Sequence, residues 1–336
     1  MAPIPMILDV DTGVDDALAI LYAVASPEIE LLAVTCVNGN VPVDMVVRNT
    51  LVLLEAAGRT GVEVAAGAER PLVEPERHGY EVHGPEGLGH ARIPVPTLRP
   101  SRRGAVELLV EELRAAPGRI ALVTTGPLTN LALALRAEPG LLTLARSCTM
   151  MAGAFRGRGN TLPRSEANVW YDPEAADEVF RAAGALPEDA LPLAIGLDVT
   201  EEALLRPRDL DRICEPAPDS ALARLIRDAS EFYIGFERAT FRGLDACFLH
   251  DPLAVAAAID PSLVATEVCH VEVELEGRHT RGETVADFVR LWRHPLNEMY
   301  GLAEAADNLR AATEVDERTF EDRFVDRLRG LVAANA

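Results

Sequence analysis

Short apolar runs alternate with longer amphipathic stretches through the first two-thirds of this chain. The runs at residues 4–8, 31–37 and 120–124 have the length of buried strands, whereas the stretches at 43–57 and 101–116 repeat their apolar residues with a helical period. Further strands are predicted at 62–65, 148–151 and 191–197, and a further helix at 172–183. Strands that alternate with helices indicate an α/β fold: an open, mostly parallel sheet with helices on both faces.

Polar residues at the start of three predicted helices are candidates for N-caps. Ser101 opens one helix, and Asp172, which is followed by proline, opens another. Asp15 or Asp16 can cap the first helix, which continues through Leu21. The N-terminal acidic residues therefore lie where a strand ends and a helix begins, which is the edge at which open α/β sheets bind ligands.

Two segments interrupt the alternation of strands and helices. Residues 69–100 are rich in proline, glycine and charge, and a loop of this length inside a compact fold is usually functional or disordered. Residues 218–245 begin with a long helical pattern whose aromatic residues are explained most simply by core packing: Phe232, Tyr233, Phe236 and Phe241. No change of composition marks a boundary. We therefore expect a single domain over 1–336, with inserted active-site loops near 69–100 and 218–245.

The composition excludes several classes of function. The chain has 336 residues, of which 49% are hydrophobic, so it is long enough to bury a sizeable core. Its net charge of −21 would repel nucleic acids and anionic membrane surfaces. All the basic residues other than histidine are arginine, which excludes a lysine Schiff base or a P-loop lysine. Genomic base composition explains the missing lysine more simply than selection on function does.

Cysteine usage and hydropathy predict a soluble, cytoplasmic protein. The five cysteines are scattered and odd in number, and no pair has metal-ligand spacing: Cys36, Cys148, Cys214, Cys247 and Cys269. This pattern is typical of buried free thiols in a reducing compartment. The N-terminus lacks the pattern of a signal peptide, and no apolar stretch is long enough to span a bilayer.

Residues 9–16, Asp-Val-Asp-Thr-Gly-Val-Asp-Asp, place four carboxylates within eight positions, directly after the first apolar run. Crowded carboxylates repel one another, so a fold that packs them together needs a proton or a cation between them. A second acidic position, Asp251, follows His250 far downstream. A polar cluster lies between them and contains Asn160, Glu166 and Asn168, whose side chains suit hydroxyl groups.

Each downstream feature alone has an ordinary structural explanation. Asp251 can be an N-cap, His250 a structural histidine, and the polar cluster a loop that satisfies its own backbone. Together with the N-terminal motif, however, Asp11, Asp16 and Asp251 offer hard oxygen ligands at one sheet edge, to which the strand-end carbonyl of Thr125 adds another. Hard oxygens without cysteine or a required histidine favour Ca²⁺ or Mg²⁺ over zinc.

The order of these motifs resembles that of the nucleoside hydrolases, the inosine–uridine-preferring family, from Ile7 to about Phe288. The resemblance rests on residues 9–16, 37–40, 82–84, 125–130, 160, 166–168, 172–176, 250–252 and 280–287. It implies a Rossmann-like nucleoside hydrolase fold and a nucleosidase, a hydrolase acting on N-glycosyl compounds. The implied reaction is calcium-dependent hydrolysis of a ribonucleoside to ribose and free nucleobase, by a homodimer or homotetramer.

The resemblance also implies roles for individual residues. Ca²⁺ would be held by Asp11, Asp16, Asp251 and the Thr125 carbonyl, and Asp11 would act as general base on a water molecule. The ribose hydroxyls would be bound by Asp15, Asn40, Asn160, Glu166, Asn168 and Asp251. His83 and His250 would lie near the base, where His250 helps to protonate the leaving group.

The chain departs from the family pattern near the nucleobase. Ala167 replaces a frequent phenylalanine, and Phe236, Arg238 and Phe241 stand where the helix over the base often carries tyrosines. We therefore expect an apolar lid that discriminates weakly between bases, with purine or pyrimidine preference open. Near the C-terminus, three residues belong either to the core or to a subunit interface: Trp292, Met299 and Tyr300.

Two alternative functions compete with this interpretation. The Asp-Val-Asp-Thr run at 9–12 matches the opening of haloacid-dehalogenase-like, Mg²⁺-dependent phosphatases, but their chemistry normally needs a lysine, and this chain has none. A non-catalytic ribose- or calcium-binding module would keep the pocket without turnover. The presence of every predicted ligand and of the general base argues against it.

Overall fold

A central sheet organises the protein, whose computed structural model describes residues 2–241, 243–294 and 305–336. Within these residues the sheet has nine strands in the order β10-β9-β11-β6-β5-β4-β1-β2-β3. They are β1 (Ile4–Val10), β2 (Ile29–Cys36), β3 (Glu63–Ala66), β4 (Ala121–Thr124), β5 (Ser147–Met151), β6 (Leu193–Ile195), β9 (Val264–Val273), β10 (Thr284–Asp287) and β11 (Leu309–Val315). A separate pair joins β7 (Leu204–Leu205) to β8 (Cys247–Phe248).

The sheet is mostly parallel, as the sequence predicts. The strands from β3 to β6 and on to β11 pair in parallel, whereas β9 is antiparallel to both β11 and β10. β1 lies between β2 and β4, where Asp9 is opposite Thr35 on one side and Thr124 on the other. Because these strands run in the same direction, the segments that follow them meet at one edge: residues 11–16, 37–40 and 125–127.

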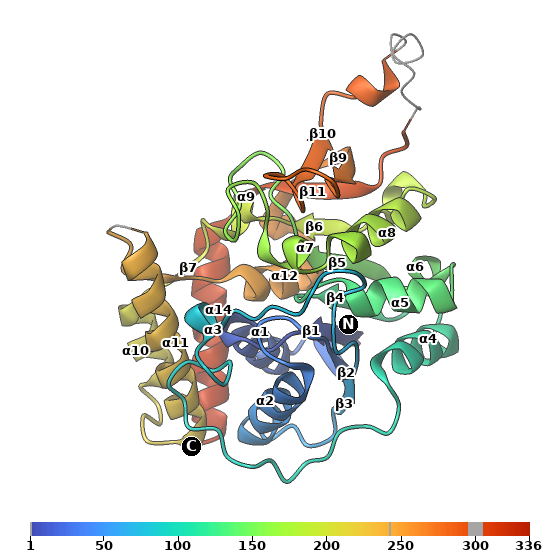
Figure 1. Ribbon diagram of the computed structural model, residues 1–336. Coiled ribbons are helices and arrows are strands. Elements are labelled where there is room, and N and C mark those ends of the chain that lie inside the picture. The colour runs from blue at the N-terminus through green and yellow to red at the C-terminus, as the bar shows by residue number, and fades with distance from the viewer. Residues whose placement is uncertain (1, 242, 295–304) are drawn as a thin grey trace.

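Helices cover both faces of the sheet and form two hydrophobic cores (Figure 1). Met6, Leu8 and Val10 of β1 point into one core and Ile7 into the other, as expected for a strand buried on both faces. The first core includes α1 (Val14–Ala25), α2 (Val43–Ala56), α10 (Pro207–Cys214), α11 (Ala221–Thr240), α12 (His250–Ile259) and α14 (Glu317–Ala334). The second includes α4 (Ala105–Ala115), α5 (Thr129–Ala137) and α8 (Pro173–Ala183).

Shorter helices occupy the connections. They are α3 (Tyr80–His83), α6 (Leu141–Leu144), α7 (Ala167–Tyr171), α9 (Leu197–Thr200) and three 3₁₀ turns, η1 (Glu188–Ala190), η2 (Pro261–Leu263) and η3 (Leu291–Arg293). The segment 69–100 is irregular apart from α3, and the segment 218–245 is mainly α11, which Ser220 caps by accepting from the Ala223 N–H. α11 packs against α3, so the two inserted segments lie side by side (Figure 1).

The predicted helix caps are correct at one of three positions. Asp172 caps α8 by accepting from the Ala175 N–H at 3.1 Å. Ser101 is not a cap, because its hydroxyl donates to Glu63 and α4 begins only after Gly104. Neither Asp15 nor Asp16 is the N-cap residue of α1, which begins after Gly13; both lie in its first turn, where the Asp16 carboxylate accepts from the Gly13 N–H at 2.9 Å.

The alternative that Asp251 is an N-cap is also wrong. α12 begins after Leu249, so Asp251 lies in the first helical turn, and no backbone group within the described chain donates to it as a cap. Near the C-terminus, the backbone N–H of Trp292 donates to Asp287 at 2.8 Å. The indole ring of Trp292 packs edge-on against His270, so Trp292 belongs to a local turn. Met299 and Tyr300 lie outside the described residues.

Two further observations concern the whole described chain. All five cysteines are buried and free. Among the described residues, the structure has no helix with both the length and the apolar character that crossing a membrane requires.

Candidate active site

The acidic motif occupies the turn from β1 to α1, at the carboxyl edge of the sheet. Asp9, Asp11, Asp15 and Asp16 are all buried. The turn is packed tightly by the neighbouring strand ends, since a Cβ atom on Gly39 would lie only 2.0 Å from Asp11 Oδ2. The sequence therefore places four buried acids at this edge, of which Asp9 is hydrogen-bonded to the Thr35 hydroxyl at 2.5 Å and to the Asn130 amide at 2.8 Å.

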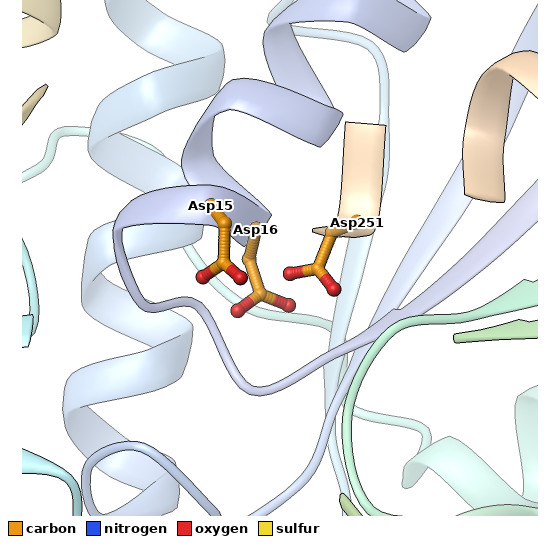
Figure 2. A group of neighbouring side chains, drawn as sticks. All are labelled: Asp15, Asp16 and Asp251. Carbon is orange, nitrogen blue, oxygen red and sulfur yellow. The ribbon is translucent and has the colours of Figure 1, made fainter. Parts of the chain in front are cut away.

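Three carboxylates converge at this edge (Figure 2). Asp15 and Asp16 come from the first turn of α1, and Asp251 comes from the first turn of α12; one oxygen of each lies within 4.8 Å of the others. Figure 2 shows the three side chains turned toward a common space. Two of the predicted metal ligands, Asp16 and Asp251, are thus brought together, and Asp15, predicted to bind ribose, joins them.

Asp11 and Thr125 reach this cluster through Asp16. Asp16 Oδ1 accepts from the Asp11 N–H at 3.2 Å and from the Thr125 hydroxyl at 2.8 Å, while Oδ2 accepts from the Gly13 N–H at 2.9 Å. Asp11 Oδ2 accepts from the Asn40 N–H at 2.7 Å. The network fixes the orientation of both carboxylates before any ligand binds.

Several carboxylate oxygens are buried without a partner. Among the described residues, Asp11 Oδ1 and Asp15 Oδ1 make no hydrogen bond. Burial and the negative charge of Asp16 raise the pKa of Asp11 well above its usual range, and the same causes raise the pKa of Asp15 to about 8. Burial and neighbouring acids also raise the pKa of Asp251 well above its usual range. Unpaired, hard, mutually repelling oxygens fit a divalent cation.

A cavity of about 360 Å³ opens above the acidic cluster. Its lining contains nine of the predicted site residues: Asp15, Asn40, His83, Thr125, Asn160, Glu166, Asn168, His250 and Asp251. Asp11 and Asp16 do not line the cavity. They lie beneath it, where Asp16 accepts from the Asp11 N–H and from the Thr125 hydroxyl. Residues from six separate parts of the chain therefore face one space.

The polar cluster at 160–168 serves the backbone and the cavity together. Asn160 accepts from the Ala167 N–H at 2.9 Å, and Glu166 caps α7 by accepting from the N–H groups of Asn168 and Val169. Asn168 Nδ2 donates to the Thr125 carbonyl at 2.7 Å. The local explanation from the sequence is thus correct, and it also leaves the amide of Asn160 and the carbonyl of Asn168 available to a ligand.

Two buried histidines border the cavity. His83 Nδ1 accepts from the Val14 N–H at 3.1 Å, so the neutral ring carries its proton on Nε2. His250 Nδ1 lies 2.7 Å from the Thr200 hydroxyl. Burial lowers the pKa of each ring to about 3, helped at His83 by His250 and at His250 by the positive charge of Arg158. Both rings are therefore neutral at pH 7.

The prediction of an apolar lid is wrong. Phe236 and Phe241 line the cavity, but so do Tyr233 and Glu237, which the sequence analysis did not assign to the site. Arg238 faces away and pairs with Asp245. The helical period explains the error, because positions 233, 236, 237 and 240 share one face of α11 whereas position 238 is turned from it.

Comparison with known proteins is consistent with this site. The family model of the inosine-uridine preferring nucleoside hydrolase matches residues 6–322. A pyrimidine-specific ribonucleoside hydrolase, RihA, of Enterobacter sp. (strain 638) is 36% identical over 326 residues, covering 97% of this chain and 97% of that protein.

Two solved structures have the same fold over nearly their full length. A purine-preferring ribonucleoside hydrolase from Gardnerella vaginalis has a TM-score of 0.88 and 34% identity, covering 98% of this chain and 99% of that chain. A plant nucleoside hydrolase has a TM-score of 0.88 and 32% identity, covering 97% of this chain and 99% of that chain. These matches favour the hydrolase over the phosphatase alternative. The chain belongs to the inosine-uridine preferring nucleoside hydrolase family and is a hydrolase acting on N-glycosyl compounds.

Proposed function

We propose that this enzyme hydrolyses ribonucleosides to ribose and free nucleobase in a calcium-dependent reaction. The observation that carries the proposal is the buried carboxylate cluster directly beneath a cavity lined by groups that bind hydroxyls. Such a site suits a sugar better than a phosphate, because the acids of its floor would repel an anion.

The cation would be Ca²⁺, held by Asp11, Asp16, Asp251 and the Thr125 carbonyl. The unpartnered Asp11 Oδ1 and the hard oxygen donors support this choice, and Asp15 lies near enough to contribute an oxygen. When bound, the ion supplies a positive charge that acidifies water and attracts the sugar hydroxyls.

Asp11 is the proposed general base. Ca²⁺ acidifies water less than zinc does, so a nearby carboxylate must still accept the proton. The Asn40 N–H holds one Asp11 oxygen and leaves the other without a hydrogen bond among the described residues. This arrangement presents a fixed, basic oxygen below the position of the sugar.

The remaining polar residues would bind and polarise the ribose. We assign the hydroxyl contacts to Asp15, Asn40, Asn160, Glu166, Asn168 and Asp251. Cleavage of the N-ribosidic bond builds positive charge on C1′ and the ring oxygen, and buried carboxylates stabilise that charge as it develops. Attack from the face opposite the base inverts the configuration at C1′, as in inverting glycosidases.

His83 and His250 would lie beside the nucleobase. Because the pKa of each is lowered to about 3, each acts as a neutral ring that can donate one N–H. We propose that His250 assists departure of the base by donating a hydrogen bond from its ring N–H to it, while the Thr200 hydroxyl fixes the orientation of the ring.

We also propose a single domain over 1–336, in which the segments 69–100 and 218–245 complete the site. The five free, buried cysteines support a cytoplasmic location, where thiols stay reduced. The substrate is a small ribonucleoside; neither a nucleic acid nor a membrane is a partner, and the assembly is a homodimer or homotetramer.

A ribose-release assay with and without chelator tests the proposal. We expect ribose from at least one common ribonucleoside, loss of activity with EDTA, and recovery when Ca²⁺ is added back. Ribose binding by calorimetry without release of ribose from any nucleoside would instead support the non-catalytic binding module. Activity that survives complete removal of divalent cations would contradict the assigned role of Ca²⁺.

A further inference from the structure

Glu237 is an acid on the cavity wall to which the reaction described above gives no role. It lies on α11 one helical turn after Tyr233, lines the cavity, and is only 3% exposed. Its Oε2 has no hydrogen-bond partner among the described residues. A buried carboxylate oxygen without a partner is costly, so its position calls for a ligand that donates to it.

Among the described residues, no cation forms an ion pair with this carboxylate, and the positive charge of Arg158 only lowers the pKa of Glu237. The guanidinium of Arg158 pairs with Glu201 at 2.9 Å and lies over the ring of Phe241 at 4.6 Å. Tyr233 supplies one hydrogen bond to Glu237, which lowers the pKa of that acid, whereas burial and the charge of Glu201 raise it to about 7. Glu237 therefore remains able to accept a further donor.

The surroundings of Glu237 place it on the side of the cavity that suits a nucleobase. Phe241 packs edge-on against Phe248 at 5.5 Å, Phe248 lies against His250 at 5.3 Å, and Tyr233 lies against His83 at 5.8 Å. These rings offer faces for a flat base. Glu237 lies one helical turn after Tyr233 and one turn before Phe241, so its carboxylate is placed beside these rings.

We propose that Glu237 is a specificity-determining residue whose carboxylate accepts a hydrogen bond from an exocyclic amino group, so that amino-bearing ribonucleosides are preferred over their oxo counterparts. An ionised carboxylate only accepts hydrogen bonds. An exocyclic amino group can donate two hydrogen bonds. A carbonyl oxygen at the same place repels the carboxylate, and in uracil and hypoxanthine this carbonyl lies beside the ring N–H. This inference rests on the proposed function.

Two matched substrate pairs test the preference. Cytidine with uridine and adenosine with inosine each differ at one exocyclic amino or oxo group and at the hydrogen on the adjacent ring nitrogen, on a ring of constant size. At pH 8, above the pKa of Glu237, we expect kcat/KM to favour the amino member of the pair that the cavity accepts by about tenfold or more. A ratio of one or less in wild type for both pairs overturns the assignment without any variant.

The substitution Glu237→Gln isolates the carboxylate. Glutamine keeps the shape, removes a buried charge and can donate to a carbonyl, so the amino preference should fall close to one while the melting temperature is retained. The matched control is Glu231→Gln, on the same helix but solvent-exposed beside Arg227, which should keep the wild-type ratio. An unchanged ratio in Glu237→Gln contradicts the proposal.

A base-free substrate separates this inference from the proposed function. p-Nitrophenyl β-D-ribofuranoside has the ribosyl group but no amino or oxo edge. Its hydrolysis without any amino preference among nucleosides overturns the role of Glu237 and leaves the hydrolase activity standing. Failure to hydrolyse this compound and every nucleoside overturns both.

Discussion

The floor and the wall of the cavity are built by different means. The floor comprises Asp15 and Asp251, which line the cavity, and Asp11 and Asp16 directly beneath them, whose carboxylates accept from backbone N–H groups. The wall comprises Tyr233, Phe236, Glu237 and Phe241 on one face of α11 and in the residue after it. In the proposed function the floor acts on the sugar, and we expect that the wall can change without disturbing it.

The related proteins agree with this division. A pyrimidine-specific relative and a purine-preferring one have 36% and 34% identity to this chain, and the latter superposes with a TM-score of 0.88. A shared fold therefore accommodates different bases, which means that base preference is set by local side chains. We propose that such side chains lie on the wall in this enzyme.

The largest expected effect concerns the floor and the 2′-hydroxyl. A site that buries polar groups to bind a hydroxyl rejects analogues that lack it by about 10⁴–10⁵. We expect 2′-deoxyuridine and 2′-deoxyinosine to show a loss of that order in kcat/KM relative to the ribonucleosides. Steady-state assays of matched pairs measure it, and equal rates would remove the hydroxyl-binding role of the floor.

Substitution of the general base should have the next largest effect. Asp11→Ala is expected to lower kcat by about 10³, because general base catalysis contributes about 10²–10⁴. The fold should be retained, since Asp11 makes its backbone hydrogen bond independently of its side chain. Asp44→Asn, an exposed position on α2, is the control. Near-normal turnover in Asp11→Ala would show that the base is another residue.

Truncation of the wall should act on the base and leave the sugar alone. Phe241→Ala removes a ring that packs against Phe248, and stacking on an aromatic ring contributes about 1–3 kcal/mol per base. We expect KM for nucleosides to rise by about tenfold or more, while the inhibition constant of free ribose stays constant. A parallel rise of both constants would show that Phe241 shapes the sugar site as well.

The pH dependence of stability should be the smallest effect. Its sign is opposite to that produced by acids whose pKa is lowered on folding. Burial raises the pKa of Asp15 to about 8 and that of Glu166 to about 7. Below about pH 6.5 the neutral His83 and His250 oppose this effect, because they bind fewer protons in the native state than in the unfolded state. Between about pH 6.5 and 8 the native state binds more protons than the unfolded state, so the stability of the metal-free enzyme falls as the pH rises.

Calcium should oppose this fall, because it takes the place of protons on the floor. Thermal melting at pH 6.5 and pH 8, with and without Ca²⁺, measures both effects. We expect the melting temperature of the metal-free enzyme to drop by several degrees and Ca²⁺ to stabilise more at pH 8. A melting temperature that rises over this range in the absence of metal would contradict the raised pKa values.

The sequence predicts the floor well because its signals are local. Four acids after a buried strand, and Asp251 before an apolar helix, mark sheet-edge positions even before their partners are known. Which carboxylates meet is not local: the convergence of Asp15 with Asp251 depends on the packing of α1 against α12. Similarly, serine is a residue type that often caps helices, but the Ser101 hydroxyl donates to Glu63 on a distant strand instead.

The wall is harder to predict from sequence for the same physical reason. Tyr233 and Glu237 follow the spacing of an amphipathic helix, and such spacing indicates only which residues share a face. That this face borders a cavity, rather than the core or solvent, depends on the neighbouring α3 and on the strand pair β7 and β8. The signal available in the sequence was an acid on an otherwise apolar face.

Calorimetric titration of metal-free enzyme with Ca²⁺ tests the central claim, that distant carboxylates share one cation, most directly. We predict one site per chain, whose affinity falls sharply in Asp16→Asn and in Asp251→Asn alike, although the two residues lie on different helices. Absence of Ca²⁺ binding, or binding unaffected by either substitution in a folded protein, would contradict it.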